Sequence, residues 1–563
     1  MMSYPLLEFK KEIIDEIKKI ADISEDEIDI EIPPEERGDF ALPCYFLSPI
    51  LGKDPESIAG SLAEEIELER GVVEQTGPYL NFKIDELCLS KETIAGCLDK
   101  EESFGELSSK EKKVIIEHTS ANPNGPLHVG RARNPIIGDT LARLYEKIGY
   151  DVERQYYVND IGKQMAILTW GIQNLNEEDL PSLDRDKEDY DLVRYYQKAN
   201  QMMEEDEGLE TEIQNIIREM ESGSEKVFKS LKNNSETVLS GITRSLERLN
   251  INFDTYKHES SFIDDGSVQE VIEKLSELEE TDDEEGAVYF NLNNNEIFIT
   301  REDGTNLYPI RDIAYHMWKA ERADALINVL GEDHKTHGRF IEKALRALEI
   351  EPLPELVFHS FVTFEGEEMS TRKGTYVTLD EFMDTSEKKA RKEIMKRRDD
   401  LSEEDIGNIA EKVGISAVRY NLIRVQPGKP IDFKWEEALN FQGDSAPFIQ
   451  YSYTRSHGIM DKIDEDLDEG ELDLDDLEEG EIRLIKKIAN LPLILVKSAE
   501  NNAPHKIARY AHELAAEFNQ FYRDYPVLDS EGKRKERLAI VKCFSYSMES
   551  VLDALGMKKP KRM

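Results

Sequence analysis

Cysteine is scarce in this chain, and its few cysteines are scattered. Only Cys44, Cys88, Cys97 and Cys543 occur in 563 residues. None stands in a CxxC pair, and none has a histidine at the spacing of a zinc ligand. A disulfide framework or a cysteine-based zinc site is therefore not expected. We predict that the protein holds no metal ion of its own.

Long apolar runs are also missing. No stretch approaches the ~18 consecutive apolar residues of a transmembrane helix. Residues 1–20 alternate charged and apolar positions at helical spacing, which differs from the unbroken apolar core of a signal peptide. We therefore expect a cytoplasmic protein without a membrane partner.

Basic residues are outnumbered: 71 Lys and Arg face 118 Asp and Glu, which gives a net charge of -47. This excess argues at first sight against a nucleic-acid partner. A local basic patch can still bind phosphate, however, and residues 387–398 and 533–563 are both rich in Lys and Arg. The acidity fits a salt-rich cytoplasm or an ordinary acidic surface, and the sequence leaves both explanations open.

The chain is long enough for three or four domains. Residues 112–120, KKVIIEHTS, contain a buried strand that is followed by a polar loop, a helix and a second strand, which is a parallel α/β unit. We predict a multidomain α/β plus α protein with a doubly wound, Rossmann-type central domain. The predicted divisions are a small α+β domain in 1–108, the central domain in 109–385 with a helical insertion at about 176–250, a helical connection in 386–435 and an all-α domain in 436–563.

Several shorter patterns predict individual elements. Residues 325–331, ALINVLG, read as a buried strand before a helix from about 337 to 348. Residues 356–364 are predicted to form one continuous strand, and residues 287–301 a β-hairpin. The charged residues 100–112 are predicted to form a linker.

The polar loop ANPNGPLHVGRARN follows the first strand of the α/β unit. In doubly wound folds this is where a nucleotide meets the amides of a helix N-terminus. Pro126 and Gly130 shape the turn, and Gly130 allows the backbone to approach a ligand closely. His128 can donate to a phosphate oxygen. On its own, such a loop is more often an ordinary connection.

A second polar segment, EEMSTRKGTYVTL, occupies residues 367–379. It gathers hydroxyl groups and two cations, Arg372 and Lys373, after the last predicted strand. Phosphoryl transfer needs positive charge on oxygens that become more negative in the transition state. On its own, a pair of cations is more often a solvated surface.

Together and in this order, the two segments resemble the HIGH and KMSKS signatures of class I aminoacyl-tRNA synthetases. EHTSANPNGPLHVGRARN, NLYPIRDIAY, MSTRKG, PFIQYSYTR and the C-terminal DALGMKKPKRM narrow the resemblance to arginyl-tRNA synthetases. ERGDFAL and GPYLNFKI resemble the extra N-terminal domain of that family. The resemblance implies that residues 1–108 contact tRNA, that 386–435 meets its stem and that 436–563 binds its anticodon.

The resemblance implies an enzyme that activates L-arginine with ATP and transfers it to the terminal adenosine of its tRNA. Mg²⁺ would arrive with ATP, no cofactor would be tightly bound, and a monomer is the family's usual state. The catalytic groups would be His128, Arg131, Arg372 and Lys373. The residues that contact ATP would be Pro126, His128, Gly130, Arg131, Met369, Ser370, Arg372 and Lys373.

Two positions depart from the signatures. Arg131 stands where HIGH has its second histidine, and Glu368 stands where KMSKS has its first lysine. Arg131 keeps a donor near the nucleotide, and so activity remains the expectation. The alternative is a catalytically impaired relative that binds tRNA or acts as a scaffold.

Arginine recognition requires carboxylates, because a guanidinium has five donors and no acceptor. Tyr308 and Asp312 are four residues apart and share a face if the segment is helical. The resemblance implies that Glu117 and Asp312 hold the guanidinium, that Asn122 holds the main-chain groups of the amino acid, and that His334 lies near its α-amino group.

Two local alternatives stay open. Asp312 could instead pair with Arg311 or another nearby arginine. In YVNDIGKQ, Asn159, Asp160 and Gln164 either contact the substrate or the acceptor end of tRNA, or only cap the local backbone.

Overall fold

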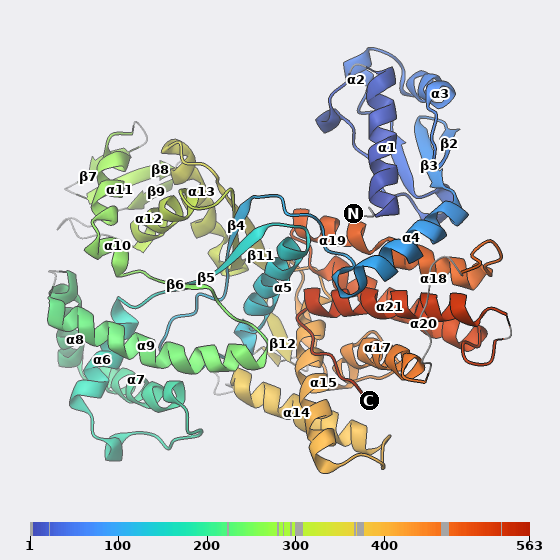
Figure 1. The fold of residues 1–563 in the computed structure, drawn as a ribbon. Helices are drawn as coiled ribbons and strands as arrows, with labels where there is room; N and C mark the ends of the chain where they lie inside the picture. The colour runs from blue at the N-terminus through green and yellow to red at the C-terminus, as the bar shows by residue number, and fades with distance from the viewer. Residues whose placement is uncertain are drawn as a thin grey trace.

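The computed structural model of the chain describes residues 4–21, 23–221, 224–278, 281–284, 287–292, 295–298, 308–364, 367–368, 377–462, 472–530 and 532–563. A small N-terminal domain, a central α/β domain and a C-terminal helical domain are visible in Figure 1. This architecture confirms the predicted fold class. The exact domain boundaries stay predictions.

The N-terminal domain packs helices against a three-stranded antiparallel sheet of order β1-β3-β2. Helix α1 forms because Leu6, Phe9, Ile13 and Ile17 recur at helical spacing, and all four are buried. The elements of this domain are α1 (Pro5–Ile20), β1 (Phe40–Pro43), α2 (Ser48–Leu51), α3 (Pro55–Glu65), β2 (Gly71–Thr76) and β3 (Tyr79–Ile84).

The central domain is built on a parallel sheet of five strands, in the order β11-β10-β4-β5-β6. β4 is the first of these strands in the chain, and the connections run outward from it to either side. A switch of this kind opens a crevice at the carboxyl ends of β4 and β10, where doubly wound folds bind ligands. The strands are β4 (Lys113–Glu117), β5 (Asp151–Val158), β6 (Thr255–His258), β10 (Ala325–Gly331) and β11 (Pro354–His359).

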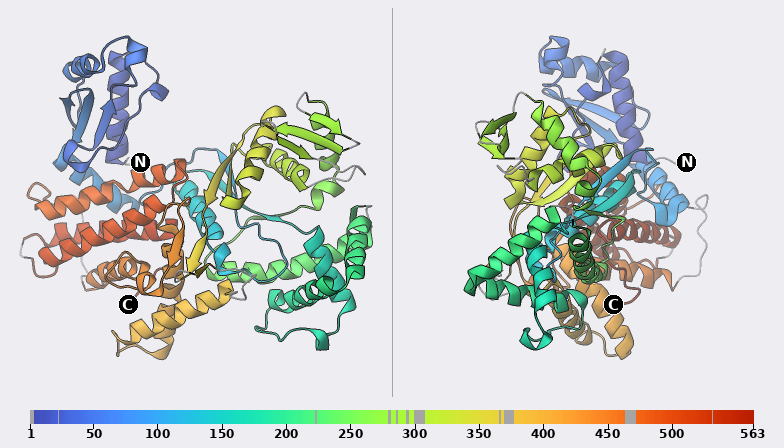
Figure 2. Two further views of the ribbon diagram at one scale, coloured as in Figure 1. Left: turned by 180° about the vertical axis from the view of Figure 1, so that it is seen from behind. Right: turned by 90° about the vertical axis from the view of Figure 1, so that its left-hand side faces the viewer.

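Helices cover and extend this sheet (Figure 2). They are α5 (Arg133–Lys147), α6 (Lys163–Asn174), α10 (Ser261–Asp264), α11 (Ser267–Ser276), α12 (Tyr308–Ala320) and α13 (Lys335–Ala347). The predicted insertion is helical and consists of α7 (Glu188–Glu205), α8 (Glu207–Glu221) and α9 (Glu225–Arg248). The predicted hairpin is present as β8 (Ala287–Leu292) and β9 (Asn295–Phe298), and β7 (Thr281–Glu284) adds a strand that was not predicted.

The prediction of one strand over 356–364 is wrong. β11 ends at His359, and β12 (Val362–Phe364) pairs in a different sheet with β13 (Glu367–Glu368) and β14 (Ile431–Phe433). The chain is redirected at Ser360, whose amide donates to Pro427 O and whose carbonyl accepts from the buried Arg133. Because β14 lies far along the chain, the local sequence gives no sign of this break.

Residues 100–112 are not a free linker, which corrects the sequence prediction. Phe104 is buried, and its ring packs edge-on against Tyr4 with centroids 5.4 Å apart. The Tyr4 hydroxyl donates to Glu106 O and accepts from the amide of Gly105. The segment therefore ties the N-terminal domain firmly to its neighbours.

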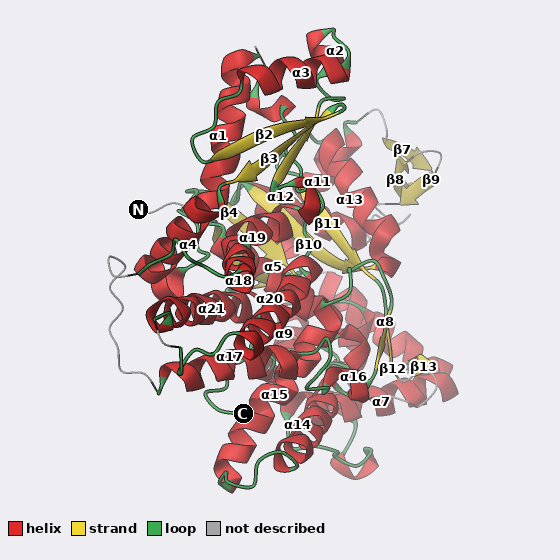
Figure 3. Ribbon diagram, turned by 90° about the vertical axis from the view of Figure 1, so that its right-hand side faces the viewer, coloured by secondary structure: helices red, strands yellow, loops and turns green. Residues whose placement is uncertain are grey.

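The C-terminal part is almost wholly helical, as Figure 3 shows. Helix α4 (Glu86–Lys100) leaves the N-terminal domain and packs along α18 and α21, where Cys97 Sγ lies 3.6 Å from Cys543 O. The helices are α14 (Leu379–Met395), α15 (Glu403–Ile423), α16 (Trp435–Ala438), α17 (Ala446–Met460), α18 (Glu479–Ala489), α19 (Leu491–Glu500), α20 (His505–Asp524) and α21 (Arg534–Ala554). None of the described helices has the length and apolar character that crossing a bilayer requires.

Candidate active site

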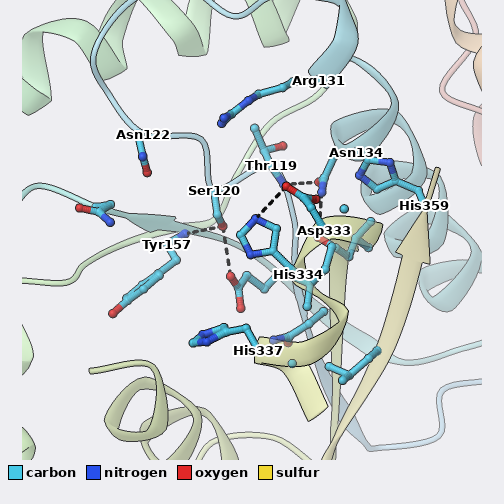
Figure 4. A pocket seen from close by; sticks show the side chains of 18 of the residues that line it. Thr119, Ser120, Asn122, Arg131, Asn134, Tyr157, Asp333, His334, His337 and His359 are labelled. Carbon is cyan, nitrogen blue, oxygen red and sulfur yellow. Dashed lines mark hydrogen bonds and ion pairs between the residues drawn. The ribbon is translucent and has the colours of Figure 1, made fainter. Parts of the chain in front are cut away.

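A cavity of about 620 Å³ opens at the carboxyl ends of β4 and β10, where the sheet topology places a ligand crevice (Figure 4). The structure brings most of the described residues that the sequence singled out to this one place. Seven of the predicted site residues line it: Glu117, Asn122, His128, Gly130, Arg131, Asp312 and His334.

The first signature forms the turn between β4 and α5. A Cβ atom on Gly130 would lie 2.9 Å from two ring atoms of His128. Any other residue at this position would therefore displace the imidazole. Burial, and then the charge of Arg131, lower the pKa of His128 to about 4. The imidazole is therefore neutral near pH 7 and can donate one N–H to a ligand. Pro126 is buried and is not among the residues that line the cavity.

The segments that flank the second signature lie at the cavity on one side and beside the first signature on the other. Its key residues Met369, Ser370, Arg372 and Lys373 lie outside the described residues. Before them, Val362 and Thr363 line the cavity. After them, Val377 O accepts from Val129 N at 3.0 Å, and Leu379 N donates to Leu127 O at 2.7 Å. The chain thus enters and leaves the second signature beside the first.

Helix α12 begins at Tyr308, as was assumed when its residues were interpreted; the side chain of Tyr308 is outside the described part. Asp312, one turn further on, is 8% exposed and lines the cavity. Its Oδ2 lies 2.5 Å from His337 Nε2, whereas its Oδ1 is buried without a hydrogen-bond partner among the described residues. The neighbouring Arg311 pairs with Glu259 at 2.7 Å instead. A pair between Asp312 and Arg311 is therefore not formed.

Glu117 ends β4 and stands at the floor of the cavity. Its Oε2 accepts from Lys319 Nζ at 2.7 Å, and its Oε1 accepts from Ser120 Oγ at 3.2 Å. The chain turns sharply after it, because Thr119 and Ser120 have positive φ angles of 69° and 38°. Such strain in residues other than glycine is concentrated at functional sites. The amide of Thr119 donates to the side chain of Asn134, which helps to hold the turn.

The polar residues after β5 divide into two groups. Asn159 lines the cavity, and Gln164 accepts a hydrogen bond of 2.8 Å from Asn122 Nδ2. Asp160 is fully buried and accepts from both the amide and the hydroxyl of Ser260, so its role is local and structural. His334, with a half-exposed side chain, stands at the rim.

Other residues of the site escaped the sequence reasoning. His316 lines the cavity, and Lys319 lies buried beneath it; they follow Asp312 by four and seven residues, so they share its helix face. That spacing is the signal that could have found them. Tyr157 stacks on Tyr315 with ring centroids 4.3 Å apart, and both line the cavity. Their pairing joins β5 to α12 and has no local signal.

Within the described ranges, no group of three or more His, Cys, Asp and Glu side chains is placed to hold a metal ion. A divalent cation at this site would therefore depend on oxygens that a ligand supplies.

The parallel sheet, the cavity at its switch point and the two adjoining signature segments define a class I aminoacyl-tRNA synthetase fold. The family described as "tRNA synthetases class I (R), catalytic domain" matches residues 93–435. "Arginyl tRNA synthetase N terminal domain" matches residues 7–84, and "DALR anticodon binding domain" matches residues 449–563. The chain belongs to the arginine–tRNA ligase family.

Known relatives agree over nearly the whole length. The chain is 42% identical over 524 residues to "Arginine--tRNA ligase" of Methanocella arvoryzae, covering 91% of this chain and 92% of that protein. It is 37% identical to "Arginine--tRNA ligase" of Halorubrum lacusprofundi, covering 99% and 100%. The Thermus thermophilus arginyl-tRNA synthetase structure shares the fold with a TM-score of 0.85 at 24% identity, over 98% of this chain and 99% of that one.

Proposed function

We propose that this chain activates L-arginine with ATP and transfers it to its tRNA. One observation carries the proposal: the buried Asp312 faces the cavity with an oxygen that no described group satisfies. An unpaired buried carboxylate oxygen is costly, and a ligand guanidinium would satisfy it with a charge-assisted hydrogen bond. The reaction is inferred from the family, and the preference for arginine is inferred from this carboxylate oxygen.

The amino acid would lie with its side chain toward α12. Asp312 and Glu117 would accept from the guanidinium, with the ring of Tyr308 against it. Asn122, oriented by Gln164, would hold the main-chain groups, and His334 at the rim would lie near the α-amino group. These assignments place the carboxylate of the substrate toward the first signature.

ATP would bind between the signatures. Gly130 and the turn at Pro126 let the nucleotide approach the backbone, and His128 donates to a phosphate oxygen. The arginine carboxylate attacks the α-phosphorus in line, an arginyl-adenylate forms and pyrophosphate leaves. Mg²⁺ travels with the phosphates of ATP. Arg131 and the second-signature groups Met369, Ser370, Arg372 and Lys373 would contact the nucleotide and stabilise the developing charge.

No protein nucleophile is needed in either step. The terminal ribose hydroxyl of tRNA attacks the carbonyl carbon of the adenylate, and AMP leaves. Positioning and charge stabilisation supply the rate. We infer that the protein works in the cytoplasm, where its tRNA partner is found, and as a monomer, which is the usual state in its family.

The tRNA would lie across the N-terminal and C-terminal domains. On the C-terminal domain, the guanidinium of Arg455 lies 4.7 Å from the ring of Tyr451 and 5.0 Å from that of Tyr522. Both rings are about two-fifths exposed. Exposed rings and an arginine plane form a platform on which unpaired bases can stack.

The competing function is a scaffold that binds tRNA without charging it. The departures at Arg131 and Glu368 favour it, but Arg131 lines the cavity and keeps a cation there. The test is charging of tRNA by the purified chain with labelled arginine, with the other amino acids as controls. Arginine-specific charging is expected. Binding of tRNA without formation of an adenylate or of charged tRNA would identify the scaffold.

A further inference from the structure

A continuous chain of hydrogen bonds crosses the floor of the cavity. Lys319 Nζ donates to Glu117 Oε2 at 2.7 Å and to Asn328 Oδ1 at 3.0 Å. Asn328 Nδ2 lies 2.6 Å from His316 Nε2, and His316 Nδ1 lies 2.6 Å from the backbone oxygen of Asp312. One assignment satisfies every group: the amide of Asn328 donates to Nε2, and Nδ1–H donates to the carbonyl. The chain therefore links the carboxylate of Glu117 to the backbone of Asp312.

Lys319 is the only cation in this chain of contacts, and it is sealed from solvent. Its side chain is 0% exposed, and its Nζ lies 4.1 Å from the ring centroid of Tyr315. Burial lowers the pKa of Lys319, while the charge of Glu117 opposes that shift. Lys319 is not among the residues that line the cavity, and so it cannot touch a ligand there directly. Any effect it has on binding must pass through its neighbours.

The charges around the floor match a single guanidinium. Glu117 and Asp312 carry two negative charges, and Lys319 returns one positive charge. These three side chains together therefore carry one net negative charge, which matches a ligand group that carries one positive charge. Without Lys319, two buried carboxylates would face one cation, and one of them would tend to hold a proton. A protonated carboxyl accepts less from a guanidinium than a carboxylate does.

We propose that Lys319 is a positioning residue for arginine binding. It holds Glu117 as a carboxylate with its Oε2 turned toward the floor, and through Asn328 and His316 it fixes that carboxylate relative to the turn that carries Asp312. This inference rests on the proposed arginine site and adds a residue that does not contact arginine. According to this inference, a buried lysine makes the site select a ligand group that carries one positive charge.

The decisive variant is Lys319→Met, which removes the charge and keeps an unbranched side chain that is only one atom shorter. We expect the KM for arginine in tRNA charging to rise at least tenfold at pH 7, while the KM for ATP stays within twofold. The rise should shrink as the pH increases to 8.5, because a buried Glu117 without its cation ionises only at higher pH. Lys319→Arg keeps the charge and should show no such pH dependence.

Other groups that titrate near Glu117 are common to both proteins. They are Asp312, Tyr315 and His316 of α12, His337 of α13, Glu153 of β5, and His128 and His334 at the cavity walls. The ratio of the arginine KM of Lys319→Met to that of the wild type therefore isolates the effect on Glu117. A ratio that does not change between pH 6.5 and 8.5 would overturn the inference.

Glu117→Gln separates this inference from the proposed function. If Glu117→Gln leaves the arginine KM unchanged, the proposed arginine site is wrong. If Glu117→Gln raises that KM and Lys319→Met does not, only the role of Lys319 fails. Because Lys319 acts through Glu117, the Glu117→Gln/Lys319→Met double variant should have the arginine KM of Glu117→Gln alone. A further tenfold rise in the double variant would contradict the proposal.

The double variant also guards against a folding defect. Gln beside Met leaves no buried charge unpaired at this position, and so it should fold even where Lys319→Met does not. Each variant is checked first by its thermal unfolding midpoint and by its KM for ATP. Where Lys319→Met does not fold, an arginine KM of the folded double variant well above that of Glu117→Gln still overturns the inference.

Discussion

Two buried aspartates of this molecule, Asp139 on α5 and Asp312 on α12, have opposite surroundings. Asp139 is 1% exposed and is surrounded by arginines: its Oδ2 lies 2.5 Å from Arg419 and 2.8 Å from Arg143, and its Oδ1 lies 3.8 Å from Arg154. Asp312 is almost as deeply buried, and each aspartate has one oxygen without a hydrogen bond among the described residues. The difference is that this oxygen of Asp139 still lies beside Arg154, whereas Asp312 contacts His337 and no described arginine.

The two aspartates differ in whether guanidinium groups of the protein itself neutralise them. Burial alone would raise the pKa of Asp139, but Arg419 and Arg143 outweigh it and lower that pKa to about 2. Arg419 also donates to Leu249 O and Leu555 O, so this cluster ties α5, α15 and the end of α21 together. At Asp312 the described residues supply no arginine, and Arg311 pairs with Glu259 instead. The first carboxylate is structural, and the second is left for a ligand.

The largest expected effect is on the structural carboxylate. Asp139→Ala leaves the fully buried Arg419 without its anion, which should cost about 3–5 kcal/mol of stability. Thermal unfolding should show a large drop in the midpoint. The arginine KM of the protein that remains folded should match that of the wild type. A variant as stable as the wild type would show that Arg419 is satisfied by carbonyl groups alone.

Asp312→Ala should behave in the opposite way. Loss of the acceptor for a buried guanidinium should weaken arginine binding by about 2–5 kcal/mol, seen as a higher KM for arginine. The unfolding midpoint and the KM for ATP should change little. Asp312→Asn should fare nearly as badly, because it replaces an acceptor oxygen with a donor. An arginine KM within twofold of the wild type would remove Asp312 from the site.

The comparison also explains what the sequence could and could not predict. The strand, loop and helix around His128 follow from local patterns and were predicted. The helix that starts at Tyr308 was only assumed when its residues were interpreted, and the structure shows it. The pairing of Lys319 with Glu117 could not be predicted, because it joins segments about 200 residues apart. The break at Ser360 escaped for the same reason. Asp160 is a carboxylate in a loop that was predicted to contact the substrate or tRNA. Only the fold shows that its oxygens already accept hydrogen bonds from Ser260.

A third buried carboxylate, Asp380, is paired with cations as Asp139 is, but it follows the second signature closely in the chain. It is 2% exposed and accepts from Lys187 at 2.8 Å, from Ser245 at 2.9 Å and from Arg248 at 3.0 Å. Lys187→Met should therefore cost about 1–3 kcal/mol and slow arginine-dependent pyrophosphate exchange severalfold, because the insertion would no longer secure the start of α14. Lys232→Met, on the exposed face of α9, is the matched control and should do neither. Normal exchange in a destabilised Lys187→Met would make Asp380 purely structural.

The structural cluster should keep its strength in mild acid. The lowered pKa of Asp139 means that its contribution is fully present above the unfolded-state value of about 3.9 and is lost only below it. Burial lowers the pKa of His118 to about 3, and so the unfolded state takes up a proton below about pH 6.5 while the folded state does not. Both the wild type and Asp139→Asn should therefore lose stability from pH 7 to pH 5, in parallel. Convergence of their unfolding midpoints at pH 5 would show that Asp139 titrates in this range.

The smallest effect is expected at the C-terminal tail, where cations that pair with carboxylates of the protein can be compared with exposed ones. Lys558 Nζ lies 3.0 Å from Glu411, and Lys559 Nζ lies 2.7 Å from Glu549, whereas Lys561 and Arg562 are exposed. Cations that are already paired with the protein are poorly placed to bind phosphate. We therefore expect Lys561→Gln/Arg562→Gln to raise the KM for tRNA severalfold and to reduce the slope of log affinity against log salt by about 1–2.

Lys558→Gln/Lys559→Gln is the matched control for this tail, because it removes the same charge from the same C-terminal residues 558–563. It should lower the unfolding midpoint slightly and leave the salt slope unchanged, since these two lysines serve α15 and α21. The KM for arginine at saturating tRNA should stay constant in both double variants. Equal loss of slope in the two variants would mean that the tail acts through its total charge. An unchanged slope in a folded Lys561→Gln/Arg562→Gln would mean that the tail does not touch tRNA, so that tRNA binding would depend on other surfaces such as the platform of Tyr451, Arg455 and Tyr522.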